Sequence, residues 1–95
     1  MAIEKGISEV DFGFSGNEAQ VVVTSQTSIL VGDHIEAYVM AGDTTTDHTA
    51  EDHRWFAAFV GITCGTIVAS TSFTIYVKSI YDLTGKYKIR WVRAS

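Results

Sequence analysis

The chain has 95 residues and a mass of 10.4 kDa, which is enough for one domain. Its net charge of −4 argues against nucleic acid as a direct partner. Hydrophobic residues make up 46% of the chain, which excludes intrinsic disorder. Val, Ile and Thr are abundant and Leu occurs only twice, so the composition excludes an all-helical bundle and favours strands.

Turn signals divide the first part of the chain into short extended runs. The N-terminal segment holds no long apolar stretch, so it does not look like a secretory signal, and we expect residues 1–8 to form an arm. Glycine-containing turns follow at residues 13–17 and 32–33. The strands predicted from these breaks are residues 10–14, 19–25, 28–31 and 34–41.

Residues 34–41 alternate as an amphipathic strand requires. Ile35 and Val39 share one face, whereas Glu36 and Tyr38 share the other. This period of two predicts a strand with one buried face and one face in water.

Residues 45–62 carry two different signals. Asp47 or Thr49 is able to cap a helical turn, and Asp52 follows Thr49 at the spacing of a capping box, so we expect one helical turn inside a loop. Residues 55–62 are apolar on both faces. This pattern predicts a central strand, or a strand with one face in a subunit contact, with residues 66–70 pairing beside it.

Two further runs, residues 73–80 and 85–94, also alternate with period two. In the second run Tyr87, Ile89 and Trp91 fall on one face, whereas the other face carries Lys86, Lys88 and Arg90. The predicted core residues are Ile35, Val39, Phe59, Ile75, Ile89 and Trp91. Together the runs predict an all-β fold, a small single-domain antiparallel β-sandwich of seven or eight strands that spans residues 1–95 and is jelly-roll-like.

The densest polar cluster of the chain lies at residues 44–54. Its histidines, His48 and His53, are five positions apart, whereas a helical zinc pair needs histidines four apart with a glutamate beside the first. We therefore predict no metal ion and no other cofactor. A hydrogen-bonded loop and a charged loop at a subunit contact both fit this composition.

No motif in the chain predicts catalysis. The serines lie outside any Gly-x-Ser-x-Gly elbow, and Cys64 lies in an apolar stretch without a basic neighbour, which predicts a buried structural thiol. The longest stretch of low polarity, residues 55–69, is shorter than the about 20 residues that a membrane span needs. We expect neither enzymatic activity nor a membrane partner.

Charge is distributed unevenly along the chain. Residues 1–53 carry a balance of −9 and residues 54–95 a balance of +5. Either the halves interleave in space, or an acidic face meets a basic face of the next copy head to tail in a ring. The basic face of the last predicted strand is then either solvated decoration of a sheet edge or the partner of the acidic half.

Three motifs carry a resemblance to a known group of proteins. They are the Asp-His-containing stretch at residues 46–53, the Phe-Thr-Ile-Tyr strand within residues 67–76, and the closing strand at residues 85–92 with Trp91. Over residues 30–94 the chain resembles short proteins encoded in tailed-phage and prophage genomes, although Ser72 stands where those proteins often carry glycine. The resemblance implies a virion component, made in the cytoplasm of a bacterial host, and supplies no catalytic residue.

Two classes of function remain. The first is a virion structural protein of the capsid or tail that assembles with itself, as a trimer or ring, and with other virion proteins. The alternative is a carbohydrate- or receptor-binding module of a tail fibre, with an exposed aromatic side chain beside carboxylates. The residues that we expect at a subunit contact are Asp47, His48, Glu51, His53, Trp55, Phe56, Val60, Lys86, Lys88 and Arg90.

Overall fold

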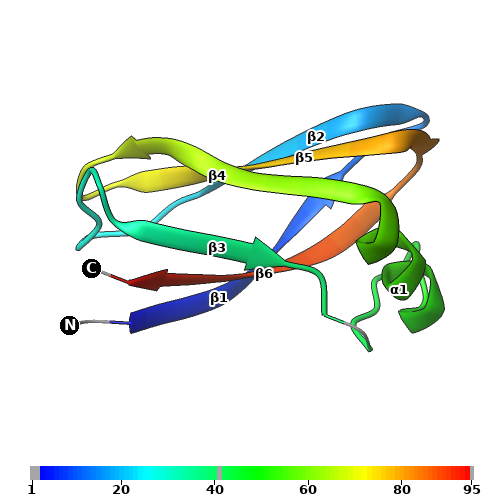
Figure 1. Ribbon diagram of the computed structural model, residues 1–95, viewed down its shortest axis with the longest axis horizontal. Helices are drawn as coiled ribbons and strands as arrows, with labels where there is room; N and C mark the ends of the chain where they lie inside the picture. Colours follow the sequence, from blue (N-terminus) through cyan, green and yellow to red (C-terminus); the bar gives the residue numbers. More distant parts are fainter. Residues whose placement is uncertain (1–2, 41, 95) are drawn as a thin grey trace.

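The computed structural model describes residues 3–40 and 42–94, which form a small, mostly β domain. Its elements are β1 (Ile3–Asp11), β2 (Gly16–Val23), β3 (His34–Tyr38), α1 (Ala50–Phe59), β4 (Val60–Val68), β5 (Ser72–Leu83) and β6 (Lys86–Ala94). The strands form two antiparallel three-stranded sheets with the orders β1-β6-β3 and β2-β5-β4. Figure 1 shows the sheets as two layers, with α1 at one end. No helix of the described residues is long and apolar enough to cross a membrane.

The core lies between the sheets, where the alternating faces of the two central strands meet. Tyr87, Ile89 and Trp91 of β6 are buried there, as are Phe73 and Ile75 of β5. The rings of Phe73 and Trp91 meet edge-on, with their centroids 5.1 Å apart. The period of two therefore predicted the inward faces of both central strands correctly.

The predicted core is confirmed in part. Ile75, Ile89 and Trp91 are buried, whereas Ile35, Val39 and Phe59 are half-buried and pack against the core from its side. In β3, Ile35 and Ala37 face inward and Glu36 and Tyr38 face outward, as expected, although the strand ends at Tyr38. Ala41, which the sequence placed at the end of this run, lies outside the described residues.

The largest departure from the predicted strands is at residues 55–62. A central strand there is wrong, because residues 55–59 complete helix α1 and only from Val60 does the chain run as the edge strand β4. A helix of 10 residues replaces the single turn that we expected. The physical reason is that Thr49 and Asp52 form a full capping box, while His53 and Phe56, one turn apart, are both buried.

Three other predictions about the strands also differ from the structure. The described residues form six strands rather than seven or eight. Residues 66–70 are not a separate strand, because β4 continues to Val68 beside β5, with irregular pairing after Gly65 where Thr66 has a φ of 51°. Residues 28–31 form turns in which only the side chain of Ile29 is buried.

The first and last strands of the chain lie side by side. β1 pairs with β6 from Ile3 opposite Ala94 to Asp11 opposite Lys86. Residues 3–8 of the expected N-terminal arm therefore belong to a sheet, because their backbone groups are paired with β6, while residues 1–2 lie outside the described part of the chain.

Candidate functional site

The polar cluster of residues 44–54 packs against the turn between β5 and β6, at the helix end of the domain (Figure 1). Thr45 Oγ1 donates to the backbone oxygen of Lys86 over 2.7 Å, and the backbone N–H of Lys86 donates to Asp47 Oδ2 over 2.9 Å. Gly85 has a φ of +77°, and a Cβ on it would lie 2.8 Å from Cβ of Asp47. The loop is therefore hydrogen-bonded and closely packed.

His48 is held between two hydrogen-bond acceptors. Its Nδ1 lies 3.1 Å from Asp52 Oδ2, its Nε2 lies 2.5 Å from the backbone oxygen of Thr84, and its ring stacks on Tyr87 at 3.9 Å. The carboxylate oxygen and the carbonyl oxygen are both hydrogen-bond acceptors, so the ring is positioned through both of its nitrogens. The hydrogen bond from His48 is the main cause that lowers the pKa of Asp52, followed by that from the backbone of Thr49.

His53 is buried and has the opposite arrangement. Its Nδ1 lies 3.0 Å from the backbone oxygen of Thr49, and its Nε2 accepts from the backbone N–H of Lys88 over 3.0 Å. One nitrogen therefore donates and the other accepts, which fixes the orientation of the ring. The side chain joins α1 to the central strand β6, so its role in this geometry is structural.

These contacts bear on the metal question. All four ring nitrogens of His48 and His53 have protein partners, so an ion would have to displace existing hydrogen bonds. Within residues 3–40 and 42–94, no group of three or more His, Cys, Asp and Glu side chains is placed to hold an ion. That no metal binds stays a prediction.

The basic residues of β6 form part of a mixed-charge face. β6 is the central strand of its sheet, so decoration of an edge is the wrong explanation for them. Arg90 donates two hydrogen bonds to the buried Asp43, over 2.9 and 2.7 Å, and this contact lowers the pKa of Asp43. Lys88 lies opposite Glu9 of β1. Acidic residues of the first half of the chain therefore lie beside Lys88 and Arg90 within one molecule.

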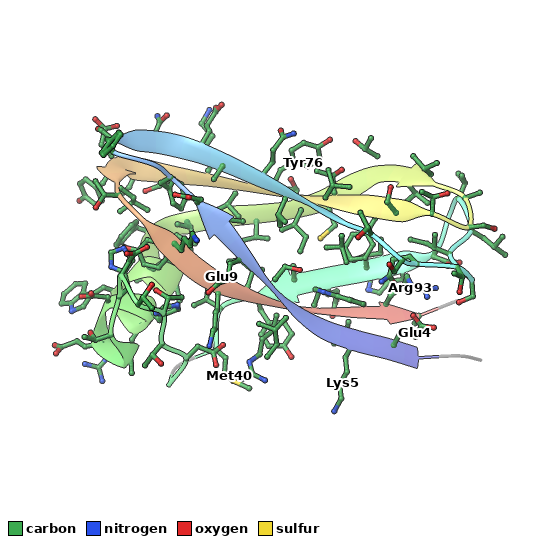
Figure 2. The ribbon with its side chains drawn as sticks, turned by 180° about the vertical axis from the view of Figure 1, so that it is seen from behind. Glu4, Lys5, Glu9, Met40, Tyr76 and Arg93 are labelled. Atoms are coloured by element: carbon green, nitrogen blue, oxygen red, sulfur yellow. The ribbon has the colours of Figure 1, made fainter. Side chains whose placement is uncertain are left out.

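A second cluster of charges lies at the opposite end of the domain and was not predicted. Arg93 is buried, and its guanidinium bonds to Glu4 Oε2 over 2.5 Å and to Asp33 Oδ2 over 3.2 Å. Figure 2 shows Arg93 and Glu4 together near the end of β6. Gln26 Oε1 and Ser28 Oγ accept further hydrogen bonds from Arg93. The cluster joins the loop between β2 and β3 to β6, through Arg93, and to β1, through Glu4.

The outer face of the β2-β5-β4 sheet carries a shallow groove of about 610 Å³. Tyr76 stands in it, and Figure 2 shows this side chain on the side of the molecule opposite to Lys5 and Met40. The phenol oxygen of Tyr76 bonds to Thr66 Oγ1. The groove is lined by Glu18, Ala19, Gln20, Gly61, Thr63, Tyr76, Val77 and Lys78.

The expected contact residues are distributed differently from the prediction. Phe56 and His53 are fully buried in the core and are therefore unavailable for a subunit contact. Trp55, on the opposite face of α1, is 63% exposed, and Glu51 is exposed as well. Val60 is half-buried against the core. Of the expected contact residues on α1, Glu51 and Trp55 are therefore the ones that remain exposed.

Cys64 of β4 is half-buried rather than fully buried. Burial raises the pKa of its thiol, which lowers the thiolate fraction and hence the reactivity of the sulfur. The expectation of a structural rather than a reactive cysteine fits this environment.

Comparisons of the chain with protein-family models, with curated proteins and with solved structures found no match. The resemblance to phage proteins therefore stays a prediction from the three motifs quoted above.

Proposed function

We propose that this protein is a structural subunit of a phage particle, in the capsid or the tail, that assembles with copies of itself. The observation that carries the proposal is that eleven large hydrophobic side chains are exposed among the described residues of this small domain. The side chains concerned are Ile7, Phe14, Val22, Leu30, Val31, Tyr38, Met40, Trp55, Val68, Ile80 and Tyr81. In the particle, neighbouring copies and other virion proteins cover this surface.

The strand order supports a finer version of the same proposal. A jelly roll has eight antiparallel strands in two sheets. We propose that β1-β6-β3 and β2-β5-β4 are the first three strands of two such four-stranded sheets, with the fourth strand missing beyond β3 and beyond β4. Jelly rolls are common in viral capsids, which is an argument by analogy of fold.

Incorporation into particles tests the proposal directly. A tagged copy of the chain is expressed in the cytoplasm of a lysogen that carries the gene, and particles are purified after induction. We expect the chain in the particles at a fixed ratio to the capsid or tail proteins. Its absence from purified particles, with the tagged chain abundant in the lysate, would contradict a structural role.

The groove around Tyr76 favours a second candidate function, the binding of a carbohydrate as part of a tail fibre. Sugar sites combine an aromatic ring with polar side chains, and here Tyr76 lies beside Glu18, Gln20 and Thr63. Calorimetric titration with bacterial surface polysaccharides tests this function. Saturable binding that is lost in Tyr76→Ala and kept in Trp55→Ala would support it, whereas no heat from any polysaccharide would exclude it.

A further inference from the structure

The two sheets end in four edge strands, and one of them differs from the rest. Edge strands are normally protected from pairing with other chains by charged side chains, proline or short length. The acidic, basic and histidine side chains are Glu4, Lys5, Glu9 and Asp11 on β1, Glu18 on β2, and His34 and Glu36 on β3. β4, Val60–Val68, carries none, and it has no proline. Of these edges, β4 is therefore the least protected.

The first two thirds of β4 are also regular in shape. Its pairing with β5 runs without a break from Val60 to Gly65, and the irregularity at Thr66 comes only after that segment. Gly61, Thr63 and Gly65 face outward, so the side chains beside the free edge are small. Residues 60–65 thus offer an unbroken row of backbone donors and acceptors to a further strand.

The side of the domain next to this edge is incompletely closed. β3 and β4 lie along the same side in Figure 1 but belong to different sheets. Two grooves between them, of about 330 and 480 Å³, are lined by polar atoms together with apolar side chains. Those contributed by the two strands are Ile35, Ala37, Val60, Ile62 and Cys64, and Val39 follows β3. These side chains are only half-buried, so a strand added to β4 would cover more of their surface.

We propose that β4 of one copy pairs antiparallel with β4 of a second copy, so that two three-stranded sheets join into one of six strands. A two-fold axis places a strand opposite itself, so a self-pairing strand must not carry charges that would meet their own copies. β4 meets this condition because it has no charged residue, whereas pairing of β3 would bring copies of Glu36 close together. The inference deepens the proposed self-assembly and rests on it.

The test compares lysine substitutions at two exposed positions of one sheet. Thr63 on β4 and Gln20 on β2 both lie opposite Tyr76, one on each side. Thr63→Lys places two like charges across the proposed contact and should weaken assembly by about tenfold or more. Gln20→Lys adds the same charge on the other edge and should assemble like the wild type. The readout is the mass by light scattering across a concentration series, with circular dichroism as the check of folding.

Hydrogen exchange of the unmodified chain gives a second measurement that does not depend on a folded variant. In a monomer, alternate backbone amides of residues 60–65 face solvent and exchange quickly, whereas pairing protects the whole row. We expect exchange in this segment to slow as the concentration rises into the assembled range, with β1 unchanged. Equal exchange of residues 60–65 in monomer and assembly would overturn the β4 contact.

The outcomes separate this inference from the proposal on which it rests. If the wild type assembles and Thr63→Lys assembles equally well, the β4 contact is wrong and self-assembly stands. If Gln20→Lys loses assembly and Thr63→Lys keeps it, the contact lies on the β2 edge. If the wild type is a monomer throughout the series, self-assembly of the chain alone and the β4 contact both fail.

Discussion

Gly6 is constrained by the side chain of Trp91 across the pair formed by the first and last strands. The two residues are opposite each other in the register of β1 and β6, and a Cβ on Gly6 would lie 2.6 Å from Cζ2 of the indole. The indole Nε1 is buried and has no hydrogen-bond partner. The contact therefore stabilises the fold through packing, and it is sensitive to one added methyl group.

Gly6→Ala should lower the free energy of unfolding by about 1–3 kcal/mol, because the methyl group forces the indole or the strand to move. Gly65→Ala is the matched control, since a Cβ there meets no atom within 4 Å and the backbone φ is ordinary. Urea unfolding measures both variants. A Gly6→Ala protein as stable as the Gly65→Ala protein would refute the close packing of Trp91 on β1.

The contact between Asp43 and Arg90 predicts how stability depends on pH. The hydrogen bonds from Arg90 lower the pKa of Asp43 in the folded chain below the value of about 3.9 expected when unfolded. The unfolded chain then binds more protons in this range, so the contribution is complete above about pH 4 and is lost as the pH falls through the folded pKa. The lowered pKa of Asp52 acts with the same sign.

Unfolding of the wild type should therefore need less urea at pH 3 than at pH 7. The Asp43→Asn variant should be less stable than the wild type at pH 7. Its urea midpoint should also differ less between pH 3 and pH 7 than that of the wild type. Urea midpoints of both proteins at the two pH values test this. An identical pH dependence of the two proteins would show that Asp43 does not contribute.

The burial of Arg93 could have been predicted from the sequence but was missed. It follows Tyr87, Ile89 and Trp91 at intervals of two, so the alternation that placed those residues in the core also places Arg93 inward. A buried arginine needs charged partners. Those partners, Glu4 and Asp33, lie far away in sequence, and no local pattern identifies them.

At the scale of whole elements, the alternation of apolar and polar residues predicted the inward faces of strands correctly. The unbroken apolar run at residues 55–62 predicted the wrong element. β3, β5 and β6 have the predicted inward faces. Residues 55–62 satisfied the pattern of a buried strand and equally that of a helix that continues into a strand. The deciding interactions are those of His53 and Phe56 with Tyr87, a residue of β6, so they became visible only in the folded chain.

The start of α1 depends on its cap. The side chain of Thr49 accepts from the backbone of Asp52 over 3.2 Å, and Asp52 Oδ2 accepts from the backbone of Thr49 over 3.3 Å. Thr49→Ala should lower the free energy of unfolding by about 1 kcal/mol, whereas Thr49→Ser should keep most of the stability. Thermal unfolding measures both variants. Equal melting temperatures for alanine and serine at this position would contradict the capping box.

The two faces of α1 predict opposite results for neighbouring aromatic residues. Phe56→Glu should unfold the domain, because the side chain is buried against Tyr87 with ring centroids 4.1 Å apart. Trp55→Glu should melt close to the wild type as a monomer, because the indole is 63% exposed. Circular dichroism melts at low concentration distinguish the two, and a folded Phe56→Glu protein would invalidate the orientation of the helix.

At the scale of the whole molecule, the charged halves of the sequence do not form separate faces. Ion pairs join Glu18 to Lys78 and Asp43 to Arg90, so the halves interleave as the first of the two interpretations held. Pairing of the first strand with the last depends on contacts across the full length of the chain, which local patterns do not encode. Complementary acidic and basic faces are therefore a weaker explanation of assembly than exposed apolar surface.

The central claim is that the chain assembles with itself mainly through apolar and backbone contacts. Exposed ion pairs contribute only about 0–1 kcal/mol each, and near-molar salt screens charges beyond about 3 Å. Light-scattering mass behind size exclusion, at high micromolar concentration in low and in near-molar salt, tests the claim most directly. We predict a mass of at least twice 10.4 kDa that persists in high salt. A monodisperse species of 10.4 kDa in low salt would contradict the account.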